Sequence, residues 1–272
     1  MEEKDIWTFP VNSKRNTICY IPESIRHPAK MCLLTCRKII KLYSKKGELI
    51  LDPMAGIGST IIEGMILGRN VIGVEYEKKF VDLAEKNIVK TKKSMKFMNT
   101  LGNGKIIKGD SRELSKLKYD GDIDSVIFSP PFADSLAGSS KDDTTKFSHG
   151  SAGKDYGDDP ENIGNKSGKN YLTEMLKIYQ ECFKVLKPEG FMALVTKNFV
   201  RKGEQIRLDL DTIKLCESAG FSLHCRHYRL IKNPSFWITN AIQKWEKKHT
   251  DKPHPYPLEE DILVFKKQEV KK

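Results

Sequence analysis

The sequence predicts an α/β protein built on a doubly wound, mostly parallel β-sheet. Short apolar runs typical of buried strands alternate with amphipathic stretches of helical period along the first half of the chain. Such alternation places helices on both faces of a parallel sheet. The 272 residues are enough for one large core, and we expect a single domain over residues 1–272.

Residues 1–47 are predicted to form an N-terminal extension followed by one helix. Residues 1–22 show no periodic pattern, and the bulky Trp7 is an expected anchor there. Pro28 suits the first turn of a helix, because its fixed φ is helical and no hydrogen-bonded N–H is lost at that position. We therefore expect a helix from His27 to about Leu42.

Seven apolar runs predict strands, and four stretches of helical period predict helices between them. Pro188-Glu189-Gly190 is expected to break one helix and Gly220 to close another. The predicted strands cover residues 48–52, 70–75, 105–110, 124–128, 191–195, 221–231 and 261–267. The predicted helices cover residues 59–67, 78–93, 170–187 and 209–219. This order predicts a Rossmann-like, doubly wound sheet of seven strands.

Two long segments interrupt the alternation. Residues 133–168 contain six Gly, six Ser and six Asp, half of the segment, and almost no apolar periodicity. We expect a mobile substrate loop there, with passive disorder as the alternative. Residues 232–260 form an insertion with several lysines, in which Trp237 and Trp245 are expected to pack rather than to stack on bases.

The first predicted strand runs into a glycine turn, Asp52-Pro53-Met54-Ala55-Gly56-Ile57-Gly58-Ser59-Thr60. Glycines let the backbone approach a ligand that a Cβ would obstruct, although a plain strand-to-helix turn also explains them. Glu75 ends the next strand, where an acid can accept hydrogen bonds from ribose hydroxyls. Asp110 ends the third strand, where it could meet the amine of an adenine. Asp52 would repel a pyrophosphate but suits the cationic methionine end of S-adenosylmethionine.

A second motif, Ser129-Pro130-Pro131-Phe132, follows the buried strand at 124–128. With the glycine turn, it resembles the motifs of the nucleic-acid amino-methyltransferases. This family has the class I methyltransferase fold and methylates adenine N6, cytosine N4 or guanine N2 with S-adenosylmethionine. The serine in the first position resembles the cytosine-N4 branch best. His27-Pro28-Ala29-Lys30 resembles the family's additional motif, which helps to close over the methionine end.

The resemblance covers about residues 20–230 and implies a role for each matching residue. Ser129 and the Pro130 carbonyl would accept both N–H hydrogens of the base amine, which restores the nitrogen lone pair, while Phe132 would stack on the base. Catalysis would then rest on positioning and electrostatics, with no covalent role for Ser129. The implied catalytic residues are Ser129, Pro130, Pro131 and Phe132. The implied cofactor-binding residues are His27, Lys30, Asp52, Met54, Ala55, Gly56, Gly58, Ser59, Thr60, Glu75, Tyr76, Asp110 and Ser111.

A nucleic acid is the expected partner, because the net charge is +11. DNA and a structured RNA such as ribosomal RNA are equally favoured. A duplex base would have to be flipped out of the stack. The expected substrate-binding residues are Lys141, Lys146, Phe147, Lys154, Tyr156, Lys197 and Arg201, with lysines for phosphates and aromatic rings for stacking.

Other functions stay open on the sequence alone. Adenine-N6 or guanine-N2 methylation is the nearest alternative. A non-catalytic nucleic-acid-binding protein would not need Asp52, Glu75, Ser129 and Phe132 together. A methyltransferase of protein or small-molecule amines is disfavoured by the charge and by serine in place of asparagine at position 129.

The remaining features predict a cytoplasmic, soluble protein without a metal. Six cysteines lack paired CxxC spacing, which is typical of reduced cytosolic thiols. No apolar run approaches the roughly 20 residues that span a bilayer. His224-Cys225-Arg226-His227 tempts a metal interpretation, but alternation along a strand sends its side chains to opposite faces. A monomer is favoured.

Overall fold

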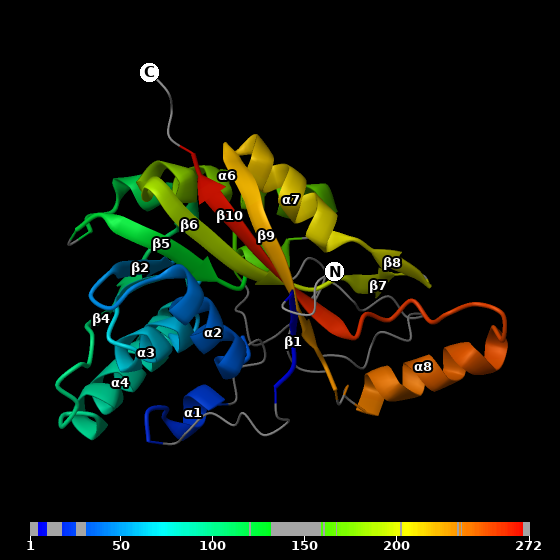
Figure 1. Cartoon of the computed structure of the whole chain (residues 1–272), viewed down its shortest axis with the longest axis horizontal. Coiled ribbons are helices and arrows are strands. Elements are labelled where there is room, and N and C mark those ends of the chain that lie inside the picture. The colour runs from blue at the N-terminus through cyan, green and yellow to red at the C-terminus, as the bar shows by residue number, and fades with distance from the viewer. Residues whose placement is uncertain are drawn as a thin grey trace.

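An eight-stranded sheet lies between two layers of helices in the computed structural model (Figure 1). The structure describes residues 5–9, 18–25, 31–119, 121–131, 159, 161–166, 168–201, 203–232, 234 and 236–268. The strand order is β1-β9-β10-β6-β5-β2-β3-β4. The strands are β1 Ile6–Trp7, β2 Leu49–Asp52, β3 Asn70–Glu75, β4 Gly104–Lys108, β5 Ile123–Phe128, β6 Leu186–Thr196, β9 Phe221–Leu230 and β10 Glu259–Lys267.

Five neighbouring strands, β4-β3-β2-β5-β6, run parallel, and β10 is antiparallel to both β6 and β9. The predicted doubly wound, mostly parallel fold is therefore confirmed. The sheet has one strand more than expected, because Ile6 and Trp7 pair with Tyr228 and Arg229 of β9. Trp7 is buried at this edge, as its size predicted.

Side-chain alternation divides the core into two layers. In β2, Leu49 and Leu51 belong to one buried cluster and Ile50 to the other. Both faces are covered, so the strand reads as a continuous apolar run. Figure 1 shows α2, α3 and α4 on one face and α6 and α7 on the other. The helices are α1 Pro22–Ile25, α2 Leu33–Tyr43, α3 Ser59–Ile66, α4 Lys78–Ser94, α6 Gly168–Val185, α7 Leu208–Ser218 and α8 Phe236–Lys248, with 3₁₀ turns η2 Ser111–Lys116 and η4 Ile163–Asn165.

Two boundaries differ from the expectation. Helix α2 begins at Leu33 rather than at His27, because Cys32 has φ of −59° and ψ of 127°, which is not helical. Residues 26–30 lie outside the described ones. Strand β6 begins at Leu186 rather than at 191. The pairing with β5 skips from Leu186 to Phe191, so the predicted breaker residues form an irregularity inside the strand, where Glu189 has φ of 64°.

The insertion at 232–260 contains a helix that was not predicted, α8. The insertion leaves and re-enters the sheet at adjacent points, because Leu230 pairs with Glu259 and the Ile231 N–H donates to the Leu258 carbonyl. Beside α8 lies a small hairpin of β7 Phe199–Arg201 and β8 Glu204–Ile206 (Figure 1). Within the described ranges, no helix is both long and apolar enough to cross a membrane.

Gly73 in β3 gives a test of the packing beneath the glycine turn. A Cβ at this position would lie 2.6 Å from the Ala55 Cβ and 2.6 Å from the Ile61 Cδ1. We expect Gly73→Ala to lower the free energy of unfolding by about 1–3 kcal/mol, measured by chemical denaturation, because the core is overpacked. Gly109→Ala, whose Cβ would meet the Val74 Cγ1 at 3.3 Å, should cost less. Equal stabilities of the two variants would contradict the tighter packing around Gly73.

Candidate active site

Four of the predicted site residues lie at one edge of the sheet. Asp52 and Glu75 end β2 and β3, Asp110 follows β4 and Ser129 follows β5. These four strands are parallel neighbours, so their carboxyl ends lie side by side. This edge is where open α/β sheets bind their ligands.

The glycine turn between β2 and α3 is fixed by left-handed glycines and by backbone hydrogen bonds. Gly56 and Gly58 have φ of 51° and 81°, a region that side chains with a Cβ rarely adopt. The Ala55 N–H donates to the Val74 carbonyl at 3.0 Å, and the Ser111 hydroxyl donates to the Pro53 carbonyl. The turn is therefore tied to both β3 and the residue that follows Asp110.

Glu75 joins the end of β3 to this turn. Its carboxylate accepts from the Gly56 N–H and from the Glu77 N–H, both at 2.8 Å. Burial raises the pKa of Glu75 to about 7, the two amide donors lower it, and the charge of Asp52 raises it further. Each carboxylate oxygen can accept a further hydrogen bond, so this group fits the hydroxyls of a ribose.

Asp52 supports the same turn from inside. The side chain is 3% exposed and accepts from the Met54 N–H at 2.9 Å and from the Thr60 side chain. Burial raises the pKa of Asp52 to about 6, although both hydrogen bonds lower it. Its contact with the cationic end of the cofactor stays a prediction.

Arg112 is a functional candidate that the sequence analysis missed. It contacts the Asp110 carboxylate at 2.6 Å, Glu174 of α6 at 2.6 Å and Glu161 at 3.0 Å. These contacts hold the pKa of Glu174 at about 2, with Arg112 as the largest cause. An arginine two residues after a strand-end aspartate is the signal that could have identified it, since it can return to the carboxylate in the same turn.

A short segment closes over the ends of β3 and β4, and we name residues 159 and 161–166 the clasp. Asp159 accepts from the Tyr76 hydroxyl at 2.7 Å, and the Asn162 amide donates to Glu77 at 2.7 Å. With the ion pair between Glu161 and Arg112, three separate contacts hold the clasp beside Glu75 and Asp110. The clasp is the described end of the loop predicted at 133–168.

The Ser-Pro-Pro segment is held from two sides. The Ser129 hydroxyl donates to the Val195 carbonyl of β6 at 3.2 Å, and the buried Tyr171 hydroxyl donates to the Pro131 carbonyl at 2.7 Å. Once Ser129 has given its hydrogen to Val195, its oxygen has lone pairs left and acts as an acceptor. Such an arrangement suits a ligand that presents N–H groups.

The other predicted residues divide into two groups. Lys197 is half-buried just after β6, and burial lowers its pKa, whereas Arg201 is exposed at the end of β7. Both lie on the strand connection that starts at the carboxyl end of β6, beside the carbonyl that holds Ser129. The predicted residues outside the described ones are His27, Lys30, Phe132, Lys141, Lys146, Phe147, Lys154 and Tyr156.

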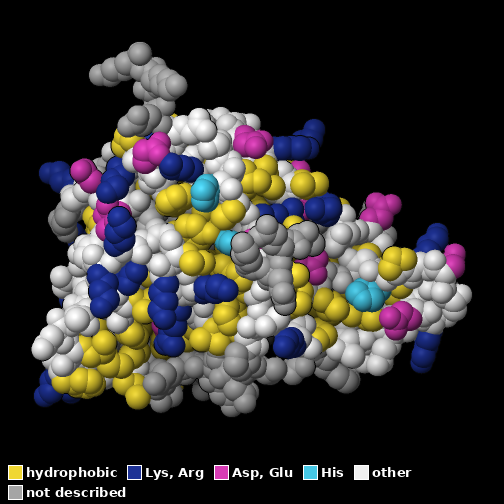
Figure 2. Space-filling view, in the orientation of Figure 1, with side chains coloured by type: hydrophobic (Ala, Val, Ile, Leu, Met, Phe, Trp, Pro, Cys, Tyr) yellow, Lys and Arg dark blue, Asp and Glu magenta, His cyan; other side chains and the backbone are white. Residues whose placement is uncertain are grey.

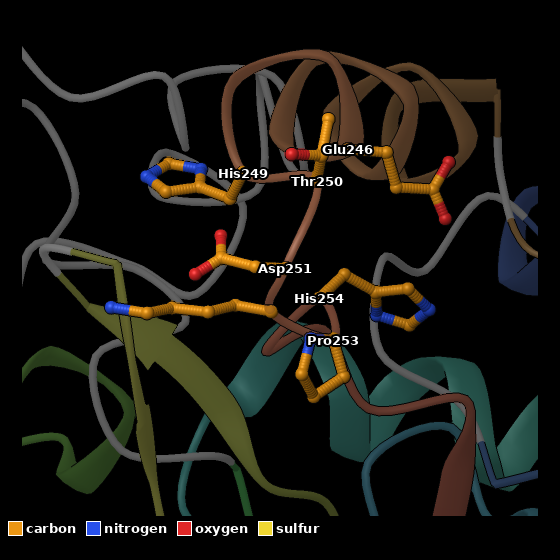
Figure 3. Close-up of a pocket in the computed structure, with 7 residues that line it drawn as sticks. Glu246, His249, Thr250, Asp251, Pro253 and His254 are labelled. Atoms are coloured by element: carbon orange, nitrogen blue, oxygen red, sulfur yellow. The ribbon is translucent and has the colours of Figure 1, made fainter.

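Two histidine-containing features lie outside the set of predicted site residues. His227 of β9 contacts the Tyr43 hydroxyl at 2.6 Å and stacks on Trp7. A hollow of about 490 Å³ at the end of α8 is lined by Glu246, His249, Thr250, Asp251, Lys252, Pro253 and His254 (Figure 3). Across the described ranges, no group of three or more His, Cys, Asp or Glu side chains is placed to hold a metal.

Glu75→Gln tests the predicted ribose contact through two opposite effects. Because the folded pKa of about 7 exceeds the unfolded value of 4.5, ionisation of Glu75 opposes folding, and stability falls as the pH rises through this window. The side chain at position 75 cannot ionise in the variant. The melting temperature of the variant minus that of wild type should therefore increase as the pH is raised from about 5 to about 8. Binding of S-adenosylmethionine, measured by calorimetry, should weaken about 10-fold or more, because a charged acceptor is lost.

Glu85→Gln on the exposed side of α4 is the matched control and should change neither quantity. If Glu75→Gln bound the cofactor like wild type, Glu75 would have no ribose contact. A melting-temperature difference that did not change with pH would contradict the raised pKa.

Comparisons with known proteins identify the family of this chain. A family profile described as DNA methylase matches residues 1–86 and 123–272. The chain is 38% identical over 86 residues to Type II methyltransferase M2.MboI of Moraxella bovis, a match that covers 31% of this chain and 29% of the relative. It is 41% identical over 75 residues to Type II methyltransferase M.BglI of Bacillus subtilis, covering 26% of this chain and 21% of the relative. These matches thus span less than a third of either relative.

Among solved structures, an S-adenosylmethionine-dependent methyltransferase from Methanosarcina mazei has the same fold. Its TM-score is 0.50 at 15% identity, and the match covers 85% of this chain and 97% of that one. The family profile covers most of the chain, including the glycine turn, Glu75 and the Ser-Pro-Pro-Phe motif. This chain therefore belongs to the DNA methylase family.

Proposed function

We propose that this protein transfers a methyl group from S-adenosyl-L-methionine to the exocyclic N4 amine of cytosine in a nucleic acid. The observation that carries the proposal is the fixed orientation of Ser129, whose hydroxyl donates to the Val195 carbonyl. The adjacent strands β2 and β5 set this acceptor beside the glycine turn. A methyl donor on the turn and an amine at Ser129 would therefore be neighbours.

The chain's own residues would bind and orient the base. Ser129 Oγ and the Pro130 carbonyl would accept the two N–H groups of the amine, which localises the nitrogen lone pair. S-adenosylmethionine supplies a sulfonium methyl group, which the nitrogen takes as the methyl–sulfur bond breaks and the sulfur keeps the electron pair. The nitrogen then releases one proton to water. The Tyr171 contact keeps the proline segment rigid, so little reorganisation is needed in the transition state.

Cytosine is favoured over adenine by the serine at position 129, a small acceptor that the resemblance associates with N4 methylation. The DNA methylase family supports a nucleic-acid substrate. Figure 2 shows Lys and Arg side chains over α2, on a molecule whose net charge is +11, and a polyanion would be attracted to such a surface. We propose that Lys197 and Arg201 contact the polynucleotide beside the flipped base.

The test is to identify the product. Purified protein is incubated with labelled S-adenosylmethionine and one of two nucleic acids, genomic DNA or ribosomal RNA. Each nucleic acid comes from a strain that lacks the gene. Nucleosides from each are analysed by mass spectrometry. N4-methylated cytosine in one of the two polymers is expected, and the polymer decides between DNA and RNA. N6-methyladenine or N2-methylguanine would overturn the choice of base, and no product in either would overturn the proposal.

Ser129→Ala should lower kcat by about 10²–10³-fold on the identified substrate, because one positioned acceptor is lost. The affinity for S-adenosylmethionine, measured separately by calorimetry, should stay within about twofold of the wild-type value, since the Ser129 side chain is not expected to contact the cofactor at the glycine turn. Ser125→Ala is a matched control: its buried hydroxyl lies in β5, the strand that Ser129 follows, and has no hydrogen-bond partner in the described structure. The control should keep full activity, and equal losses in both variants would refute the assigned role.

A further inference from the structure

The residues ahead of α2 run along helix α4 and are held to it by a ladder of side-chain hydrogen bonds. We name residues 18–25 the strap. The Ser94 and Thr91 hydroxyls donate to the Ile18 and Cys19 carbonyls at 3.0 and 3.3 Å, and the Lys90 ammonium donates to the Tyr20 carbonyl at 3.2 Å. Figure 1 shows α1, the helical end of the strap, beside α4. The strap is thus docked by side chains from successive turns of one helix.

Asn87 makes the last contact of this ladder and is different from the others. Its Oδ1 accepts from the Ile21 N–H at 2.9 Å and from the Ser24 hydroxyl at 3.3 Å. Its Nδ2 donates to the Ile57 carbonyl at 3.0 Å, in the middle of the glycine turn. The side chain is fully buried, and the donor at Ile21 and the acceptor at Ile57 fix the orientation of the amide.

Two further contacts tie the strap and the turn to the same support. Ala84, three residues before Asn87 on α4, is in contact with the turn, because a Cβ on Gly58 would lie 3.3 Å from the Ala84 Cβ. The Tyr20 hydroxyl donates to the buried Glu63 of α3 at 3.1 Å, and α3 starts directly after the turn. The strap and the turn therefore share α3 and α4, and Asn87 hydrogen-bonds to both.

We propose that Asn87 is a positioning residue for S-adenosylmethionine: it holds the glycine turn in its binding conformation and couples that turn to the strap. The proposal rests on the cofactor site at the glycine turn and deepens it. A cofactor that fixes the Ile57 carbonyl strengthens the hydrogen bond to Asn87, and this in turn orders the Ile21 N–H. Coupling of this kind is reciprocal, so an undocked strap weakens cofactor binding by the same factor.

The experiment compares Asn87→Ala and Asn87→Asp with Thr91→Ala in the full chain. Asn87→Ala removes both contacts, while Asn87→Asp keeps the acceptor for Ile21 but loses the donor to Ile57. Thr91→Ala loosens the strap one turn away without touching the glycine turn. Calorimetry gives the affinity for S-adenosylmethionine, and hydrogen exchange of peptides within 18–25 reports the docking of the strap.

We expect both Asn87 variants to bind S-adenosylmethionine about 10-fold more weakly or worse, and Thr91→Ala to stay within about twofold. The KM for the cofactor should rise while kcat at saturating cofactor changes little, whereas a merely structural defect would lower the active fraction and kcat. In wild type, adding the cofactor should slow exchange in the strap. In Asn87→Asp this slowing should disappear although the strap stays docked.

Two results would overturn the proposal. One is equal cofactor affinity in Asn87→Ala and Thr91→Ala, and the other is strap exchange in wild type that does not respond to the cofactor. The second measurement needs no variant, so it decides the matter even if the Asn87 variants fail to fold. Calorimetry and hydrogen exchange use the cofactor alone, so a negative result in them is distinct from a failure to find methylated cytosine.

Discussion

The hydrogen bond from the Gly56 N–H to the Glu75 carboxylate joins the two strand ends on which the site is built. This hydrogen bond needs an acid at the end of β3, a left-handed glycine after β2 and direct pairing of the two strands. Loss of any one of the three would break it. Because the carboxylate is half-buried, the contact costs some desolvation that a bound ligand would offset. The site is therefore arranged to gain from a ligand that brings hydroxyl donors.

The β7–β8 hairpin is anchored by a different kind of interaction. Arg226 of β9 pairs with both Asp209 and Asp261, two acids that are almost fully buried, and Arg207 also pairs with Asp209. The Asp209 N–H donates to Asn198 at 3.1 Å, so the network grips both ends of the β7–β8 hairpin. Breaking such a buried network by removing one partner is strongly destabilising. The hairpin thus has a rigid base although its strands are short.

The hydrophobic periodicity predicted most strands of the sheet, and the residue types that follow each strand predicted the residues at its edge. Both signals depend on local sequence. Contacts between distant segments could not be predicted in this way: Asn87 reaches Ile21 and Ile57 only because three elements pack together. Helix α8 did carry a signal, since Ile238, Ala241, Ile242 and Trp245 follow a helical period, but the lysine content obscured it. The start of α2 was misplaced because Pro28 marks a permitted helix start and not an obligatory one.

The insertion that carries α8 has a consequence for how such a chain can diversify. Its two ends meet at a paired position between β9 and β10, so the sheet closes in the same way whatever the length between them. Loop-closure entropy grows slowly with length, so a longer or shorter segment costs little in folding. A Cβ on Gly203 of the hairpin would lie 3.4 Å from the Trp245 ring, so the hairpin lies against α8 and a replacement segment would still rest on it. This junction is thus an exchangeable module, at which the surface beside the hairpin can be rebuilt while the glycine turn stays unchanged.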